Sequence, residues 1–68
     1  MSNTKLTVNL VPQAVTALEL AALVTEDSRT DIVNRAIQVY EYLMNCVADG
    51  ADIVIRSKDG SMEVIRFL

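Results

Sequence analysis

Three acidic side chains near the middle of the sequence are the densest group of residues that could do chemistry. Glu26, Asp27 and Asp31 could share a metal ion or act as a general acid and base. Acidic residues are also common at the start of a helix, where they lie beside the positive end of the helix dipole. We prefer this structural interpretation and predict neither a metal site nor a catalytic pair.

The turn-like sequence Lys58-Asp59-Gly60 is the second candidate, because lysine beside glycine can hold a phosphate. It lacks the glycine spacing and the lysine-serine ending of a phosphate-binding loop, so we interpret it as a turn. The sequence has no histidine and a single cysteine, Cys46, which excludes a disulfide or an ordinary zinc site within one chain. Cys46 is read as a small helix residue near an interface, or alternatively as a dimer-linking or redox-sensing thiol. We expect no cofactor and no enzymatic activity.

The charge of the chain is acidic but unevenly distributed. Nine acidic residues outnumber six basic ones, for a net charge of −3, which is unusual for a protein that binds DNA through a basic surface. Residues 1–18 nevertheless contain Lys5 and no acid. An anionic partner should therefore approach from the N-terminal side.

The size and hydrophobicity of the chain indicate association. A domain of 68 residues buries only ~60% of the surface that its unfolded chain exposes, yet 51% of this sequence is hydrophobic. Oligomerisation would cover the excess apolar surface. The sequence contains neither an apolar run of the ~20 residues needed to cross a bilayer nor a leader-like start, so we expect a cytoplasmic protein without a membrane segment.

Residues 5–10 predict a half-buried strand, because polar and apolar residues alternate strictly. One face carries Leu6, Val8 and Leu10, and the other carries Lys5, Thr7 and Asn9. Pro12 ends this strand and suits the first position of a helix over residues 12–24, which is apolar on nearly all sides.

A longer helix is predicted over residues 29–48. Its apolar residues recur at three-and-four spacing, which places a broad stripe on one side of the helix. The Ser28 hydroxyl can accept from the amide of Asp31, whose carboxylate can reach back to complete a capping box. We expect the helix to end at Asp49-Gly50, where glycine can take a left-handed conformation.

Residues 51–56 and 62–67 predict a β-hairpin around the turn. A two-residue Asp59-Gly60 turn would pair Arg56 with Glu63. A three-residue loop over 58–60 with a glycine bulge would instead pair Val54 with Val64 and Asp52 with Arg66. We favour the three-residue loop, since it gathers most apolar side chains on one face. These residues are Ala51, Ile53, Ile55, Ile65 and Phe67.

The strand over residues 5–10 has no partner in this order of elements. It could pair with the same strand of a second copy about a two-fold axis, and the resulting two-stranded ribbon would fit the major groove of DNA. A monomer in which this strand joins the hairpin in a three-stranded sheet is the alternative.

The sequence resembles the ribbon-helix-helix family, the fold of the Arc and methionine repressors. The resemblance covers about residues 4–48 and lies in the strand KLTVNL, the helix VPQAVTALELAALV and the helix opening SRTDIVNRAI. Glu26-Asp27 stands where many members have a glycine. The resemblance implies a mainly α protein with short β elements, an intertwined homodimer of β-α-α chains. Its core would comprise Leu6, Val8, Leu10, Ile32, Ala36, Ile37 and Tyr40.

The resemblance also implies the contacts with DNA. Lys5, Thr7 and Asn9 would read bases, since lysine suits guanine, asparagine suits adenine and threonine suits polar edges or a thymine methyl. Ser28, Arg29 and Thr30, at the start of the second helix, would hold a backbone phosphate.

We therefore expect a ribbon-helix-helix core over residues 1–49 and a C-terminal hairpin over residues 50–68. The expected function is that of a sequence-specific DNA-binding transcriptional regulator, in particular a repressor that occupies its operator as one dimer or as several. The alternative is an antitoxin-like or anti-host interaction module, which would bind a protein partner through its acidic surface or its hairpin. The hairpin could cover the second helix, dock a partner or join dimers.

Overall fold

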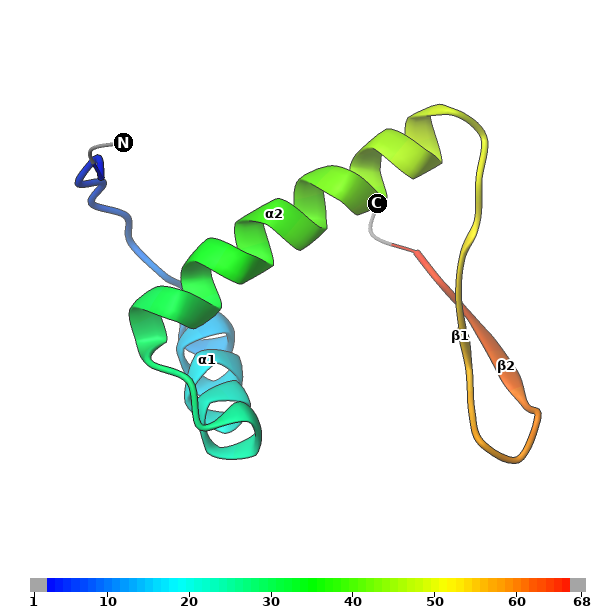
Figure 1. The fold of residues 1–68 in the computed structure, drawn as a ribbon, viewed down its shortest axis with the longest axis horizontal. Helices are drawn as coiled ribbons and strands as arrows, with labels where there is room; N and C mark the ends of the chain where they lie inside the picture. Colours follow the sequence, from blue (N-terminus) through cyan, green and yellow to red (C-terminus); the bar gives the residue numbers. More distant parts are fainter. Residues whose placement is uncertain (1–2, 67–68) are drawn as a thin grey trace. The chain divides into compact units, whose positions relative to one another are not determined.

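The computed structural model describes residues 3–66 and is mainly helical (Figure 1). Its elements are α1 (Pro12–Thr25), α2 (Arg29–Ala48), β1 (Ile53–Arg56) and β2 (Met62–Ile65). The chain divides into two compact units, and the division lies within α2, between Val33 and Asn34. The first unit holds the N-terminal segment, α1 and the start of α2. The second holds the rest of α2 and the hairpin.

Helix α1 begins where proline predicts it and is one residue longer than the predicted 12–24. Val11 is extended (φ −69°, ψ 155°), and Pro12 takes the first helical position. The helix ends without glycine, because Glu26 itself adopts the left-handed conformation (φ 60°, ψ 16°) and its N–H donates to the Ala22 carbonyl at 2.8 Å. A residue in the left-handed conformation closes many helices. For a residue other than glycine, this conformation costs free energy because the β-carbon crowds the backbone.

Helix α2 coincides with the predicted range, 29–48, and its two ends have local explanations. At the start, the N–H of Asp31 donates to the Ser28 hydroxyl at 3.1 Å, which is the expected serine cap. At the end, Gly50 is left-handed (φ 92°). Its N–H donates to the Val47 carbonyl at 2.9 Å, and the N–H of Ala51 donates to the Cys46 carbonyl at 3.0 Å. These two bonds form a Schellman motif.

Strands β1 and β2 form the antiparallel hairpin that the sequence predicts, in the favoured register. Val54 lies opposite Val64 and Arg56 opposite Met62, so the alternative pairing of Arg56 with Glu63 is wrong. The loop over residues 58–60 is closed by the N–H of Ser57, which donates to the Ser61 carbonyl at 2.7 Å. Gly60 has φ 95°, as a glycine at this bulge requires. The strands are shorter than expected, and Phe67 lies outside the described residues.

The predicted strand over residues 5–10 is not formed in the single chain. Residues 3–11 contain neither helix nor strand, and the sheet of the described residues consists of β1 and β2 only. The element order is therefore helix-helix-strand-strand, and the three-stranded sheet of the monomeric alternative is absent from the described part of the chain. The physical reason is that a strand needs the N–H and C=O groups of a neighbour, which no described segment supplies to residues 5–10.

Neither unit buries a side chain among the described residues, although many of them are apolar. In the first unit, Leu23 and Val24 are 77% and 84% exposed. In the second, half-buried side chains gather at the end of α2 and on the hairpin, at Leu43, Met44, Cys46, Ile53 and Ile65. Of the expected dimer core, Ile32 is half-buried and the remaining six residues are exposed. Each unit thus presents apolar surface that its own residues leave uncovered.

Within the described residues, neither helix combines the length and the apolar character that a bilayer crossing requires.

Candidate nucleic-acid interface

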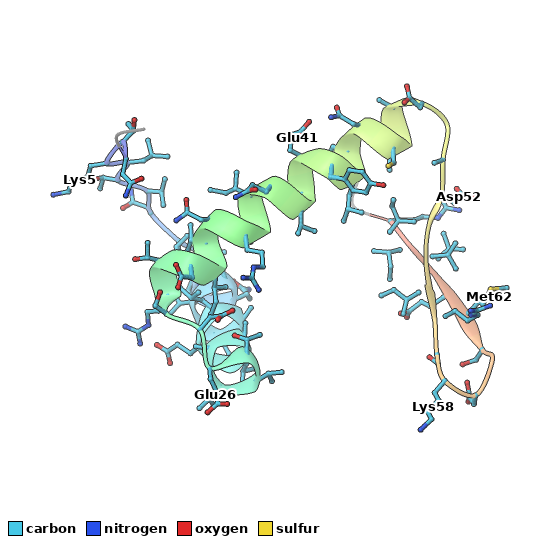
Figure 2. All side chains as sticks on the ribbon, in the orientation of Figure 1. Lys5, Glu26, Glu41, Asp52, Lys58 and Met62 are labelled. Carbon is cyan, nitrogen blue, oxygen red and sulfur yellow. The ribbon has the colours of Figure 1, made fainter. Side chains whose placement is uncertain are left out.

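The first part of the candidate site is the segment that carries Lys5, Thr7 and Asn9. All three side chains are exposed, and Figure 2 labels Lys5 on this segment. The apolar side chains that alternate with them, Leu6 and Val8, are exposed as well. The structure therefore shows no distinction between a solvent-exposed face and a buried face here, because the segment is not paired as a strand. Its polar side chains are accessible, and their alternation is a property of the sequence alone.

The second part of the candidate site is the start of α2. Ser28, Arg29 and Thr30 are consecutive and exposed at this helix end. The first N–H groups of a helix point out of its N-terminus and favour an anion there. The Ser28 hydroxyl accepts a hydrogen bond from the N–H of Asp31, so Ser28 caps the start of α2. Of the expected phosphate-binding residues, Arg29 has the side chain with the strongest affinity for an oxyanion.

Arg29 is already paired with an acid in the same unit. Its Nη2 donates to Oε1 of Glu19, on α1, at 3.4 Å. The two side chains are 69% and 57% exposed, so solvent screens the pair. Such surface pairs contribute about 0–1 kcal/mol. A phosphate could therefore displace Glu19, which is a competing ligand that the sequence analysis did not identify.

The charges around the start of α2 are mainly acidic. The described residues of the first unit contain four acids, which are Glu19, Glu26, Asp27 and Asp31. They contain only two bases, Lys5 and Arg29, so the net charge of the unit is two minus four, or −2. The acidic side chains repel a phosphate, whereas Arg29 and the helix end attract it. The balance makes this a weak anion site as it stands.

Metal binding finds no support in the described part of the chain. No three acidic or cysteine side chains there are grouped to hold an ion, and the candidate cluster of Glu26, Asp27 and Asp31 does not form one. Asp31 contributes its backbone N–H to the cap of α2, and the Asp27 N–H donates to the Thr25 hydroxyl at 3.2 Å. Both contacts are made by backbone N–H groups, and the carboxylates of the two residues take no part in them.

A small hollow lies in the second unit, between the end of α2 and the hairpin. Met44 and Val47 line it from the helix, and Ile53 and Ile65 line it from the two strands. Most of its lining is apolar, and Asp52 and Arg66 are the charged residues that line it. The residues that line the hollow include no nucleophile, and the helix and the strands on its two sides are not closely packed against each other.

The sequence analysis missed two features of the site, and each has an identifiable reason. The pair between Glu19 and Arg29 joins positions ten residues apart on two helices, so no helical spacing within one element predicts it. The left-handed Glu26 occurs where sequence patterns expect glycine or asparagine. Its only signal was the absence of glycine between two well-defined helices.

Comparisons with protein-family models, with curated proteins and with solved structures found no match to this chain.

Proposed function

We propose that the protein is a ribbon-helix-helix type homodimer that binds double-stranded DNA and regulates transcription as a repressor. The observation that carries this proposal is the segment over residues 5–10, which alternates strictly yet has no partner strand among the described residues. The segment directly precedes two helices with well-defined starts. A second copy would supply the missing ladder of hydrogen bonds.

Dimerisation in this form would also cover apolar surface. In an antiparallel ribbon, Leu6, Val8 and Leu10 of both chains share one face and would lie against the helices of the dimer. Exposed apolar residues of α1 and α2, such as Leu23 and Ile37, would contribute to the same core. Because neither unit buries a side chain by itself, we expect the folded state to depend on this association.

The opposite face of the ribbon would present Lys5, Thr7 and Asn9 from each chain. A two-stranded ribbon fits the major groove, and these three side chains supply donors and acceptors for base edges. Arg29, Thr30 and the helix end at Ser28 would hold a phosphate and set the position of the ribbon. Glu19 would have to release Arg29 for this contact.

The decisive experiment is selection from a random-sequence DNA library at low salt, with the selected DNA sequenced and the complex mass measured. We expect an enriched, roughly palindromic site bound by one or two dimers. A matched protein in which Lys5, Thr7 and Asn9 are all alanine should lose the enrichment while keeping its dimer mass. Enrichment of the same site by both proteins would contradict the proposed reading face, and no enrichment by the parent would contradict DNA binding.

A second candidate function is binding to a protein partner, as an antitoxin-like or anti-host factor. The acidic surroundings of Arg29 and the exposed apolar hairpin favour it. Salt dependence separates the two functions, since phosphate binding makes log K fall with log salt at roughly −0.9 per phosphate. A protein-binding module would retain no DNA even at low salt.

A further inference from the structure

One long edge of the hairpin is open and has a defined hydrogen-bonding pattern. The Ser57 N–H bonds to the Ser61 carbonyl, so these two residues form a hydrogen-bonded pair. Bonded and non-bonded pairs alternate along an antiparallel ladder, which makes Val54 and Val64 a non-bonded pair. The N–H and C=O of Val54 and Arg56 therefore point away from β2. In the described residues, no third strand covers this edge of β1.

The open edge of β1 is complementary to itself. If β1 of a second copy lies antiparallel along it, Val54 can face Val54 of the second copy as a hydrogen-bonded pair. The same register places Asp52 opposite Arg56 of the second copy, and Arg56 opposite Asp52 of the second copy. Both side chains are exposed in the single chain. Opposite charges in directly opposed positions stabilise a pair of strands. Because the two copies are related by a two-fold axis, the pair of Asp52 with Arg56 occurs twice.

Other two-fold pairings of a strand with its own copy do not place Asp52 opposite Arg56. Moving the β1 register by one step in either direction takes Arg56 away from Asp52. One step brings Asp52 opposite Lys58, which lies in the hairpin loop, and the other brings Asp52 opposite Val54. The open edge of β2 carries Met62, Val64 and Arg66 in the outward positions. Pairing β2 with itself about Val64 places Met62 opposite Arg66, which brings no opposite charges together. Among two-fold pairings of a strand with its own copy, the β1 edge therefore gives the better charge match. A mixed pairing of β1 with β2 can place Asp52 opposite Arg66 of the second copy, but it is heterologous and does not close into a two-chain sheet.

The marginal stability expected of an isolated hairpin supports the same occupant. Val54, Val64 and Met62 lie on one face of the hairpin, and Met62 is 70% exposed. A lone two-stranded hairpin is at best marginally stable in water, and either further strands with an apolar face or packing against a helix stabilises it. Joining two hairpins edge to edge produces a four-stranded sheet and doubles this apolar face.

We propose that the hairpins of two chains pair through β1 in this register to form a four-stranded antiparallel sheet. The pairing requires neither DNA nor the N-terminal segment, so it adds a second contact between chains to the proposed ribbon. If DNA binding also holds, the two contacts together could link neighbouring dimers.

Cross-linking tests the proposal directly in the full chain. A protein with Cys46→Ser and Val54→Cys is treated, without DNA, with a bismaleimide whose reach is below about 10 Å. The two introduced thiols at position 54 would belong to residues with α-carbons about 5.5 Å apart and should cross-link efficiently. The matched control is Cys46→Ser with Val64→Cys, because in the four-stranded sheet the two positions 64 are about 14 Å apart. We expect it to cross-link about tenfold less.

Charge exchange tests the register. In the Val54→Cys background, Asp52→Arg and Arg56→Asp should each lower the cross-linked yield about tenfold, because like charges then face each other twice. The double exchange should restore the yield. A mixture of the two single variants should also restore it, since arginines of one chain then face aspartates of the other. Persisting NMR contacts between the strands of each hairpin confirm that a variant is folded.

Several outcomes would overturn the proposal. They are an absence of cross-linking at position 54 in a folded hairpin, a higher yield at position 64, and single variants that cross-link as well as the parent. Replacing Lys5, Thr7 and Asn9 by alanine should leave the yield unchanged, so failure of DNA binding and failure of hairpin pairing are separate results.

Discussion

Arg29 and Glu19 form an ion pair between the start of α2 and the middle of α1, with 3.4 Å between Nη2 and Oε1. Arg29 is the best phosphate ligand at this helix end, so the pair ties the proposed DNA contact to an acid of the same chain. Since both side chains are more than half exposed, the pair is weak and reversible. Glu19 should therefore compete with a phosphate for Arg29 and lower the affinity for DNA.

The first prediction concerns Glu19→Gln. This change should tighten DNA binding about two- to fivefold at low salt, because Arg29 is released and one negative charge is removed. Binding is measured by fluorescence anisotropy with the selected DNA. The urea midpoint should hardly move, since an exposed pair contributes little to stability.

The control for Glu19→Gln is Glu41→Gln, which removes the same charge from α2. The Glu41 carboxylate accepts a hydrogen bond from Asn45 and is not paired with Arg29. Its effect on affinity should be clearly smaller. Equal effects of the two variants would mean that net charge matters and the pair with Arg29 does not.

The second prediction separates base reading from phosphate binding. Asn9→Ala should cost about 1–3 kcal/mol at one base position and relax specificity there, because asparagine recognises adenine through two hydrogen bonds. Arg29→Ala should weaken binding to all sequences alike and reduce the salt slope by about 0.9. The change Thr30→Ala should act in the same direction.

The matched control for Asn9→Ala is Asn3→Ala, outside the alternating segment. Competition assays against single-base variants of the selected site measure both proteins. Unchanged specificity in Asn9→Ala, or changed sequence preference in Arg29→Ala, would contradict the assigned roles.

The third prediction concerns the left-handed conformation of Glu26 (φ 60°). Glu26→Gly should stabilise the protein by about 1 kcal/mol, because glycine adopts this conformation without a clash. Glu26→Gln removes the same charge but keeps the side chain, and serves as the control. Urea unfolding at one fixed protein concentration measures both, since association affects the midpoint. Equal stabilisation by both variants would assign the effect to charge instead of backbone conformation.

The fourth prediction is a pH dependence of the hairpin turn. The Ser61 N–H and hydroxyl donate to Oδ1 of Asp59 at 2.9 and 2.7 Å, and these bonds hold the pKa of Asp59 below its usual 3.8. A lowered pKa means that the ionised carboxylate stabilises the folded turn above about pH 4. That contribution is lost as the pH falls through the lowered pKa.

NMR titration of the Asp59 carboxyl measures this effect. Ser61→Ala removes one donor and should move the pKa of Asp59 back toward 3.8. Ser57→Ala changes a serine on the other side of the same turn and should leave the titration as it is. A titration that is insensitive to Ser61→Ala would rule out the hydroxyl as a cause of the shift.

Local sequence signals predicted the parts of the fold whose cause is local. Pro12 and Ser28 mark the helix starts because each acts within one turn of the helix that it begins. Gly50 and Gly60 occupy left-handed positions that end α2 and shape the hairpin loop. The hairpin register followed from the loop length and from the apolar alternation of its strands.

The remaining features depend on groups that are distant in the sequence. Residues 5–10 alternate as a strand does, but the structure leaves them unpaired, because hydrogen-bond partners must come from another segment or another chain. The candidate reading face of Lys5, Thr7 and Asn9 was visible in the sequence only as a pattern. By itself, then, the sequence determined helix limits, caps and hairpin register. The tertiary structure decided that Arg29 meets Glu19, because that contact joins side chains of two different helices across the turn between them.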